Sequence, residues 1–228
     1  MTPKRFATAD LGIAFEEDSL RAGGRSVLMW TAHEPAIVVP RTREREAGFE
    51  ALGARAAEGG WPLLVRSSGG GAVPQGPGTL NLALISPLRR GSTIVDGYRA
   101  LCGAIADALL VFGVQAQPGG VDWSFCDGVW NVTVAGKKLA GTAQRWRSAG
   151  GGTMVALLHA AIVVQMPPDN VWPLLDAVER SGSAKLGVRK EVHTSLAELL
   201  DVGACLPELC LELERCAHAQ LAQLTGPA

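Results

Sequence analysis

The chain has 228 residues, of which 47% are hydrophobic and 19% charged, and this composition excludes disorder and fibrous repeats. Its 21 basic and 22 acidic side chains give a formal charge of -1 without any lysine- and arginine-rich stretch, so no nucleic-acid partner is expected. The longest apolar stretch, residues 154–166, is too short to span a bilayer, and no signal sequence is apparent, which predicts a cytoplasmic protein without membrane contact. Five cysteines without a C-x-x-C pair favour reduced thiols, and four scattered histidines predict no metal site.

Helix and strand patterns alternate through the N-terminal half. A first helix is expected to end near Arg21, and Gly23-Gly24 separates it from a strand at residues 27–30. The next expected elements are a strand at 36–39, a helix over 41–58 ended by Gly59-Gly60, strands at 63–65 and 80–85, and a helix over 93–112 with Ile94, Leu101, Ile105 and Leu109 as its core stripe.

The C-terminal half begins with a β pattern and ends with helices. Residues 121–164 approach a period of two, with a hairpin signal at Ala135-Gly136-Lys137. Helices are expected over 167–178, 194–200 and 207–224, the last with Leu209, Leu213 and Ala217 on one face. With no repeat or linker, residues 1–228 are expected to form one mixed α/β domain with a short helical C-terminal segment from about residue 190.

A glycine-rich loop follows the strand at 63–65 and consists of Arg66, Ser67, Ser68, Gly69, Gly70, Gly71, Ala72 and Val73. Glycines here let the backbone approach a ligand and present N–H donors to a carboxylate, a phosphate or an oxyanion. The spacing is neither that of a Walker loop nor G-x-G-x-x-G, so the loop by itself favours a flexible turn.

Two further motifs accompany this loop, Gly78-Thr79-Leu80-Asn81 and Gly136-Lys137-Lys138-Leu139-Ala140-Gly141-Thr142-Ala143-Gln144. In combination, over most of the chain, they resemble the lipoate and biotin protein ligase superfamily, specifically its lipoate branch. The resemblance implies that the glycine loop binds the acyl chain and, where one is used, the adenylate, and that Lys138 touches the acyl carbonyl. Biotin ligases fit less well because their arginine-rich glycine loop is absent, and too few residues follow Leu200 for the accessory domain of long lipoate ligases.

Within the superfamily, Ser124-Phe125-Cys126-Asp127-Gly128 looks most like the amidotransferases that take octanoyl from the glycine-cleavage H protein. In those enzymes the cysteine of S-F-C-x-G holds the acyl group as a thioester, a position that Cys126 occupies. A thiolate needs a nearby cation or dipole, and Lys138 is a candidate that would also stabilise the oxyanion. A simple hairpin does not bring Lys138 to Cys126, so the segment at Cys126 would have to curl back.

The chain also departs from the family pattern. Pro74-Gln75-Gly76-Pro77 stands where many relatives have a His-Asp pair, Gly151-Gly152-Thr153 was matched to their His-Gly-Thr, and only Asn131 remains of the R-x-N-D segment of ATP-using ligases. Arg145 and Arg147 flank Trp146 and favour a solvated strand end slightly over docking to an acidic lipoyl domain.

The resemblance implies an α+β fold with a mixed, largely antiparallel sheet, flanking helices and a small helical C-terminal cap, as in class II biotin/lipoate ligases. It implies an acyltransferase that moves octanoyl or lipoyl groups to a lysine of lipoyl-domain proteins, namely the glycine-cleavage H protein and 2-oxoacid dehydrogenase E2 subunits. That route requires no cofactor. The alternatives are an ATP- and Mg-dependent lipoate ligase that forms an adenylate, and a non-catalytic acyl-binding relative.

The expected site comprises two catalytic residues, Cys126 and Lys138, and a set of acyl-binding residues. The latter are Arg66, Ser67, Ser68, Gly69, Gly70, Gly71, Ala72, Val73, Asn81, Gly141, Thr142, Ala143, Gln144 and Thr153. Small residues in the glycine loop and at 139–143 are expected to wall a narrow tunnel for the alkyl chain.

Overall fold

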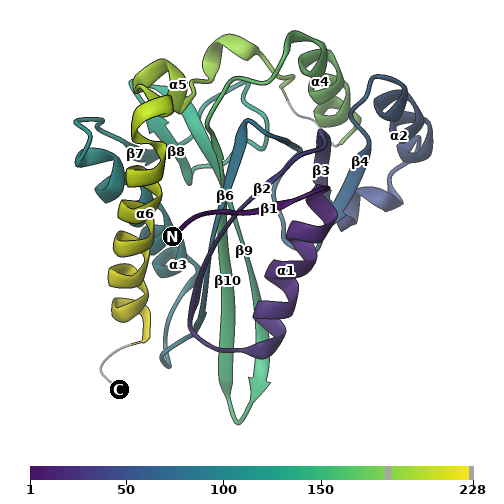
Figure 1. Ribbon diagram of the computed structural model, residues 1–228. Helices are drawn as coiled ribbons and strands as arrows, with labels where there is room; N and C mark the ends of the chain where they lie inside the picture. The colour runs from purple at the N-terminus through teal and green to yellow at the C-terminus, as the bar shows by residue number, and fades with distance from the viewer. Residues whose placement is uncertain (183–185, 226–228) are drawn as a thin grey trace.

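The computed structural model describes residues 1–182 and 186–225 as a large sheet, a small sheet and flanking helices (Figure 1). The large sheet has the order β1-β2-β6-β10-β9-β8-β7, and all neighbours in it are antiparallel except β1 and β2. Its strands are β1 (Lys4–Phe6), β2 (Ser26–Ala32), β6 (Thr79–Pro87), β7 (Gln117–Gly119), β8 (Asn131–Val134), β9 (Lys137–Gly150) and β10 (Thr153–Val163). The expected mixed, largely antiparallel sheet with flanking helices is confirmed.

The small sheet has the order β4-β3-β5, with β3 parallel to β4 and antiparallel to β5. Its strands are β3 (Ala36–Pro40), β4 (Leu63–Arg66) and β5 (Val73–Gln75). The glycine loop joins β4 to β5 and therefore lies at one end of this sheet. Two helices, α2 (Phe49–Glu58) and α4 (Trp172–Ser181), lie beside it (Figure 1).

Helices cover both faces of the large sheet. On one face, α3 (Ile94–Leu110) and α6 (Val202–Thr225) pack against each other and against alternate residues of the strands, such as Leu82 and Leu158. On the other face lies α1 (Ala9–Ala22), which approaches β2 so closely that a Cβ on Gly12 would lie 2.3 Å from the Trp30 ring. Glycine is therefore required at this contact. A short helix, α5 (Leu196–Leu199), precedes α6.

Several expected helix limits were wrong. Residues 41–58 are divided into a 3-10 helix, Arg41–Arg45, and α2, because Gly48 adopts a left-handed φ of 83° between them. The segment beginning at residue 167 forms a 3-10 turn, Asp169–Val171, before α4 begins. Another short 3-10 helix spans Lys190–Val192, and α6 begins before Pro207 and includes it. In α3, Ile94 is 59% exposed and lies outside the core stripe.

No helix among residues 1–182 and 186–225 is both long enough and apolar enough to cross a membrane.

Candidate active site

A narrow cavity of about 40 Å³ lies between the large sheet and the small sheet, next to α1. Its floor is made of small residues on β9 and β10, including Gly141, Ala143 and Ala161. Its roof includes Val38 and Val73 of the small sheet. These residues border a narrow space of the kind that an alkyl chain fills, while Glu16, Arg66 and His159 add polar groups to the wall.

Cys126 lies at the wall of this cavity, in the loop between β7 and β8, and is 4% exposed. Its sulfur accepts a hydrogen bond from the backbone N–H of Gly71 at 3.1 Å. The two backbones meet so closely that a Cβ on Gly71 would lie 2.7 Å from the Cα of Cys126. The glycine loop thus supplies a close approach to the cysteine, which accounts for a glycine at this position.

Lys138 is fully buried, and its ammonium group is directed at the segment that carries Cys126. Its Nζ donates to the carbonyl oxygen of Cys126 at 2.8 Å and to that of Phe125, and lies 4.7 Å from the centre of the Phe125 ring. The chain turns at Cys126, where φ is 47°, and therefore curls back toward β9, as a contact between Cys126 and Lys138 requires. Lys137, the neighbouring lysine, is exposed.

Arg66 places a second buried cation at the glycine loop. Its guanidinium donates to the carbonyl oxygens of Val38, Gly69 and Gly71 at 2.8–2.9 Å. Burial lowers the pKa of Arg66, whereas the sulfur of Cys126 and the carboxylates of Glu179 and Glu16 raise it. The loop, the arginine and the cysteine therefore form one electrostatically coupled unit.

Glu179 of α4 supports the same unit from the side of the small sheet. Its buried carboxylate accepts the backbone N–H of Ala72 and, at 3.5 Å, that of Cys126. Glu179 was not expected from the sequence, because it lies in an ordinary amphipathic helix pattern far from every motif.

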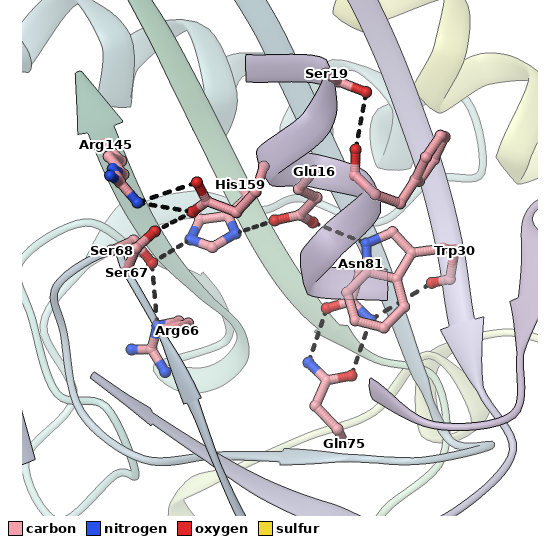
Figure 2. Close-up of polar contacts among 12 residues, drawn as sticks. Glu16, Ser19, Trp30, Arg66, Ser67, Ser68, Gln75, Asn81, Arg145 and His159 are labelled. Atoms are coloured by element: carbon pink, nitrogen blue, oxygen red, sulfur yellow. Dashed lines mark hydrogen bonds and ion pairs between the residues drawn. The ribbon is translucent and has the colours of Figure 1, made fainter. Parts of the chain in front are cut away.

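A chain of polar side chains crosses the cavity wall, and its members Glu16, Trp30 and His159 were not expected from the sequence. Figure 2 shows His159 of β10 between Ser68 and Glu16, with its Nε2 2.8 Å from the Ser68 hydroxyl and its Nδ1 2.7 Å from the Glu16 carboxylate. Glu16 also accepts the indole N–H of Trp30 at 2.8 Å, and Arg66 Nε donates to Ser68 at 3.1 Å. His159 was not among the site residues expected from the sequence, although it lines the cavity.

His193 contacts Phe125, the residue before Cys126. Its Nε2 accepts the backbone N–H of Phe125 at 3.2 Å, its Nδ1 donates to the carbonyl oxygen of Arg189 at 2.9 Å, and its ring stacks on Phe125 with centroids 4.5 Å apart. Burial and then the charge of Lys138 lower the pKa of His193 to about 3. The ring is therefore neutral at neutral pH and accepts a hydrogen bond at Nε2.

The structure gathers most of the residues singled out from the sequence around this cavity. Those that line it are Arg66, Val73, Asn81, Cys126, Gly141, Thr142 and Ala143. The remaining loop residues hold the site together: Ser68, Gly69, Gly70, Gly71 and Ala72 contact Arg66, Cys126 or Glu179. Ser67 contacts Glu17 of α1, the residue after the cavity-lining Glu16.

Two of the expected acyl-binding residues lie elsewhere. Thr153 is exposed at the far tip of the β9–β10 hairpin, eight residues along β10 from Ala161, and the match of Gly151-Gly152-Thr153 to a site motif was wrong. Gln144 faces the opposite side of the sheet, where its amide donates to the carbonyl oxygen of Ile94 at 2.8 Å. Side chains alternate along β9, so Gln144 and Ala143 cannot both face the cavity.

The two arginines near the end of β9 are engaged with α1. Arg145 forms an ion pair with Glu17 at 2.9 Å (Figure 2), and Arg147 donates to the carbonyl oxygen of Arg21 at 2.8 Å. Both contacts attach the helix to the sheet. Among the described residues, no group of three or more histidine, cysteine, aspartate or glutamate side chains could hold a metal ion.

Residues 13–215 match the family model of the lipoyl protein ligase A/B catalytic domain, and the chain belongs to this family. Octanoyl-[GcvH]:protein N-octanoyltransferase of Kyrpidia tusciae is 33% identical over 214 residues, which cover 88% of this chain and 73% of that protein. The resemblance to the lipoate branch, and within it to octanoyltransferases, is thereby confirmed.

Solved structures show the same fold. Lipoate-protein ligase A bound with ATP has a TM-score of 0.69 at 21% identity and covers 97% of this chain and 86% of that chain. A bi-partite lipoate protein ligase of Thermoplasma acidophilum, studied with its E2 lipoyl domain, has a TM-score of 0.64 at 17% identity and covers 98% of this chain and 84% of that chain. The expected lipoate ligase-like fold is confirmed by both.

Proposed function

We propose that the protein is an acyltransferase that moves an octanoyl or lipoyl group to a lysine of lipoyl-carrier domains through a thioester on Cys126. The observation that carries this proposal is the position of the Cys126 sulfur at the wall of the alkyl-sized cavity, with the Gly71 N–H donating to it at 3.1 Å. A Cβ on Gly70 would lie 3.0 Å from both Arg66 Nη2 and the Cys126 sulfur, and Lys138 Nζ donates to the carbonyl oxygen of Cys126 at 2.8 Å. Cations and N–H donors close to a cysteine are the surroundings in which its sulfur acts as a nucleophile.

The reaction proceeds in two balanced steps. The Cys126 thiolate attacks the carbonyl carbon of an acylated donor lysine, the C–S bond forms, and the C–N bond breaks as the leaving nitrogen takes up a proton. The amine of the acceptor lysine then attacks the thioester, the new C–N bond forms with loss of a proton, and the thiolate returns. One amide is broken and one is made, so this route consumes no nucleotide and needs no metal. The positive charge of Lys138 stabilises the oxyanion in both steps.

We infer that the donor and the acceptors are lipoyl domains. The relative from Kyrpidia tusciae is named for octanoyl transfer from GcvH, and the Thermoplasma structure concerns a ligase and an E2 lipoyl domain. The glycine-cleavage H protein is therefore the proposed donor and the E2 subunits of 2-oxoacid dehydrogenases the proposed acceptors. Residues 1–228 would act as one catalytic domain, with the helices from about residue 190 as its cap.

The test is the intact mass of the purified protein after incubation with octanoylated H protein in the absence of ATP. We expect an octanoyl adduct on Cys126 that the substitution Cys126→Ala abolishes while circular dichroism shows an unchanged fold. Cys102→Ala is the matched control and should retain the adduct, because burial raises the pKa of Cys102 to about 12 and keeps it a thiol.

A different result would favour the ligase. If Cys126→Ala still attaches free lipoate to a lipoyl domain with ATP and Mg, and catalyses exchange of pyrophosphate, then the chemistry passes through an adenylate and Cys126 only lines the cavity. If neither thioester nor adenylate forms, the protein is an acyl-binding relative without catalysis.

A further inference from the structure

We propose that the side-chain amides of Gln75 and Asn81 close the far end of the acyl cavity and limit the bound acyl group to about eight carbons. The inference rests on the proposed thioester at Cys126 and adds to it the position at which the alkyl chain ends. Both amides line the same cavity as Cys126, and each residue is 5% exposed.

The two amides form a reciprocal pair. Gln75 Nε2 donates to Asn81 Oδ1 at 2.8 Å, and Asn81 Nδ2 donates to Gln75 Oε1 at 2.8 Å (Figure 2). Asn81 rises from β6 of the large sheet, whereas Gln75 belongs to β5 of the small sheet. The pair therefore bridges the two sheets that enclose the cavity.

The floor of the cavity gives one measure of its length. Gly141 on β9 pairs with Ala161 on β10, and Ala161 pairs with Asn81 on β6, so the three residues form one row across the sheet on the same face. Neighbouring strands lie ~4.8 Å apart, which places Asn81 ~10 Å from Gly141. Gly141 itself lies beside the nucleophile, since a Cβ on it would be 3.9 Å from the Cβ of Cys126.

The roof gives an independent measure. The Cys126 sulfur is bonded to the N–H of Gly71, and Gln75 lies four residues further along the chain that forms β5. At ~3.3 Å per residue, this segment spans at most ~13 Å. An extended eight-carbon acyl chain measures ~9 Å from carbonyl carbon to methyl group, given carbon–carbon bonds of about 1.5 Å. The row across the floor therefore places Asn81 near the end of such a chain, and the upper limit set by the roof is long enough to contain it.

The chemistry of the pair suits this role. Each amide satisfies the other, so a methyl group can rest against the pair without leaving a polar group unpaired. A longer chain has to separate the amides, which leaves two buried polar groups without their partners. The pair is thus a barrier to chains longer than the cavity, while shorter chains meet no such penalty.

The experiment measures Cys126 acylation by thioester donors of four to fourteen carbons, alongside calorimetric binding of the corresponding free fatty acids. For the unmodified protein we expect both signals to persist up to octanoyl and the acylation rate to fall at least about a hundredfold at dodecanoyl, a typical limit for discrimination by an apolar pocket. The double variant Gln75→Ala, Asn81→Ala removes both partners together, so neither amide is left unpaired, and it should accept dodecanoyl within about tenfold of octanoyl.

The conservative exchange Gln75→Asn, Asn81→Gln keeps two facing amides and should keep the limit at octanoyl. Equal acylation by octanoyl and dodecanoyl in the unmodified protein would overturn the inference without any need for a variant, and so would an unchanged limit in the folded double variant. A failure of the proposed function looks different: no acyl chain would become attached to Cys126, whereas fatty-acid binding would still show the length limit.

Discussion

Replacing His193 by glutamine should remove a large part of the pH dependence of stability between pH 7.5 and 5.0. His193 is buried at 2% exposure, and its pKa is lowered from 6.5 to about 3 by burial and by Lys138. In the unfolded chain the imidazole takes up a proton as the pH falls below 6.5, whereas the folded protein does not until about pH 3. The unfolded state therefore binds more protons in this window, and stability decreases as the pH falls.

The magnitude follows from the width of the window. One proton difference changes the free energy of unfolding by about 1.4 kcal/mol per pH unit. Between pH 7.5 and 5.0 the His193 contribution should therefore amount to about 2 kcal/mol, most of it below pH 6.5, and it should be nearly absent above pH 7.5. Glutamine cannot titrate, so the variant loses this contribution even if its stability at pH 7.5 is lower.

Urea denaturation at several pH values between 7.5 and 5.0 measures this effect in the unmodified protein and in His193→Gln. The exposed His218 offers the control, because His218→Gln should keep the pH dependence of the unmodified protein. The reasoning is refuted if His193→Gln retains the full slope, or if the unmodified protein becomes more stable as the pH falls from 6.5.

Three further substitutions test the site. Lys138→Ala should lower the rate of acyl transfer at least about a hundredfold by removing oxyanion stabilisation, whereas Lys137→Ala, at an exposed position, should change it little. Equal losses of both variants in single-turnover assays would show that Lys138 has no specific role in the reaction. Ala143→Phe should fill the cavity floor and abolish fatty-acid binding measured by calorimetry at an unchanged melting temperature, and undiminished binding would contradict the position of the acyl chain. Arg66→Gln should lower the free energy of unfolding by about 3 kcal/mol, because three backbone carbonyls lose a charged donor. Urea denaturation measures this loss, and a loss below about 1 kcal/mol would contradict the expectation.

The sequence predicted most of the helices and longer strands because they carry strong local signals, whereas the three-residue strands β1, β5 and β7 were not expected. The hairpin between β8 and β9 follows from Ala135-Gly136-Lys137, and α3 begins with a capping box at Thr93 and Asp96 that closes its first turn. Helix limits were predicted less well where a single residue decides them. Gly48 interrupts one expected helix, and Pro207 is tolerated within another, although a proline normally marks a boundary.

The site could be predicted only where a motif carries it. The motifs around Cys126 and Lys138 identified residues that the fold brings together, but their contact depends on a turn that no pairing of strands predicts. His159 and Glu179 were missed because their importance comes from long-range contacts between segments with ordinary patterns. The expectation for Thr153 failed for a related reason: the β9–β10 hairpin is long, and the residue matched by sequence lies at its tip.

The residues of strand β10 are under two different structural constraints, depending on the face of the sheet to which they point. His159 and Ala161 face the cavity, whereas Leu158 and Ile162 face the helical layer formed by α3 and α6. Substitutions at the first pair can reshape the space for a ligand without changing the packing against α3 and α6, because neighbouring residues of a strand point to opposite faces. Such a strand allows ligand preference to drift among relatives while the architecture is preserved, and it restricts that drift to every second position.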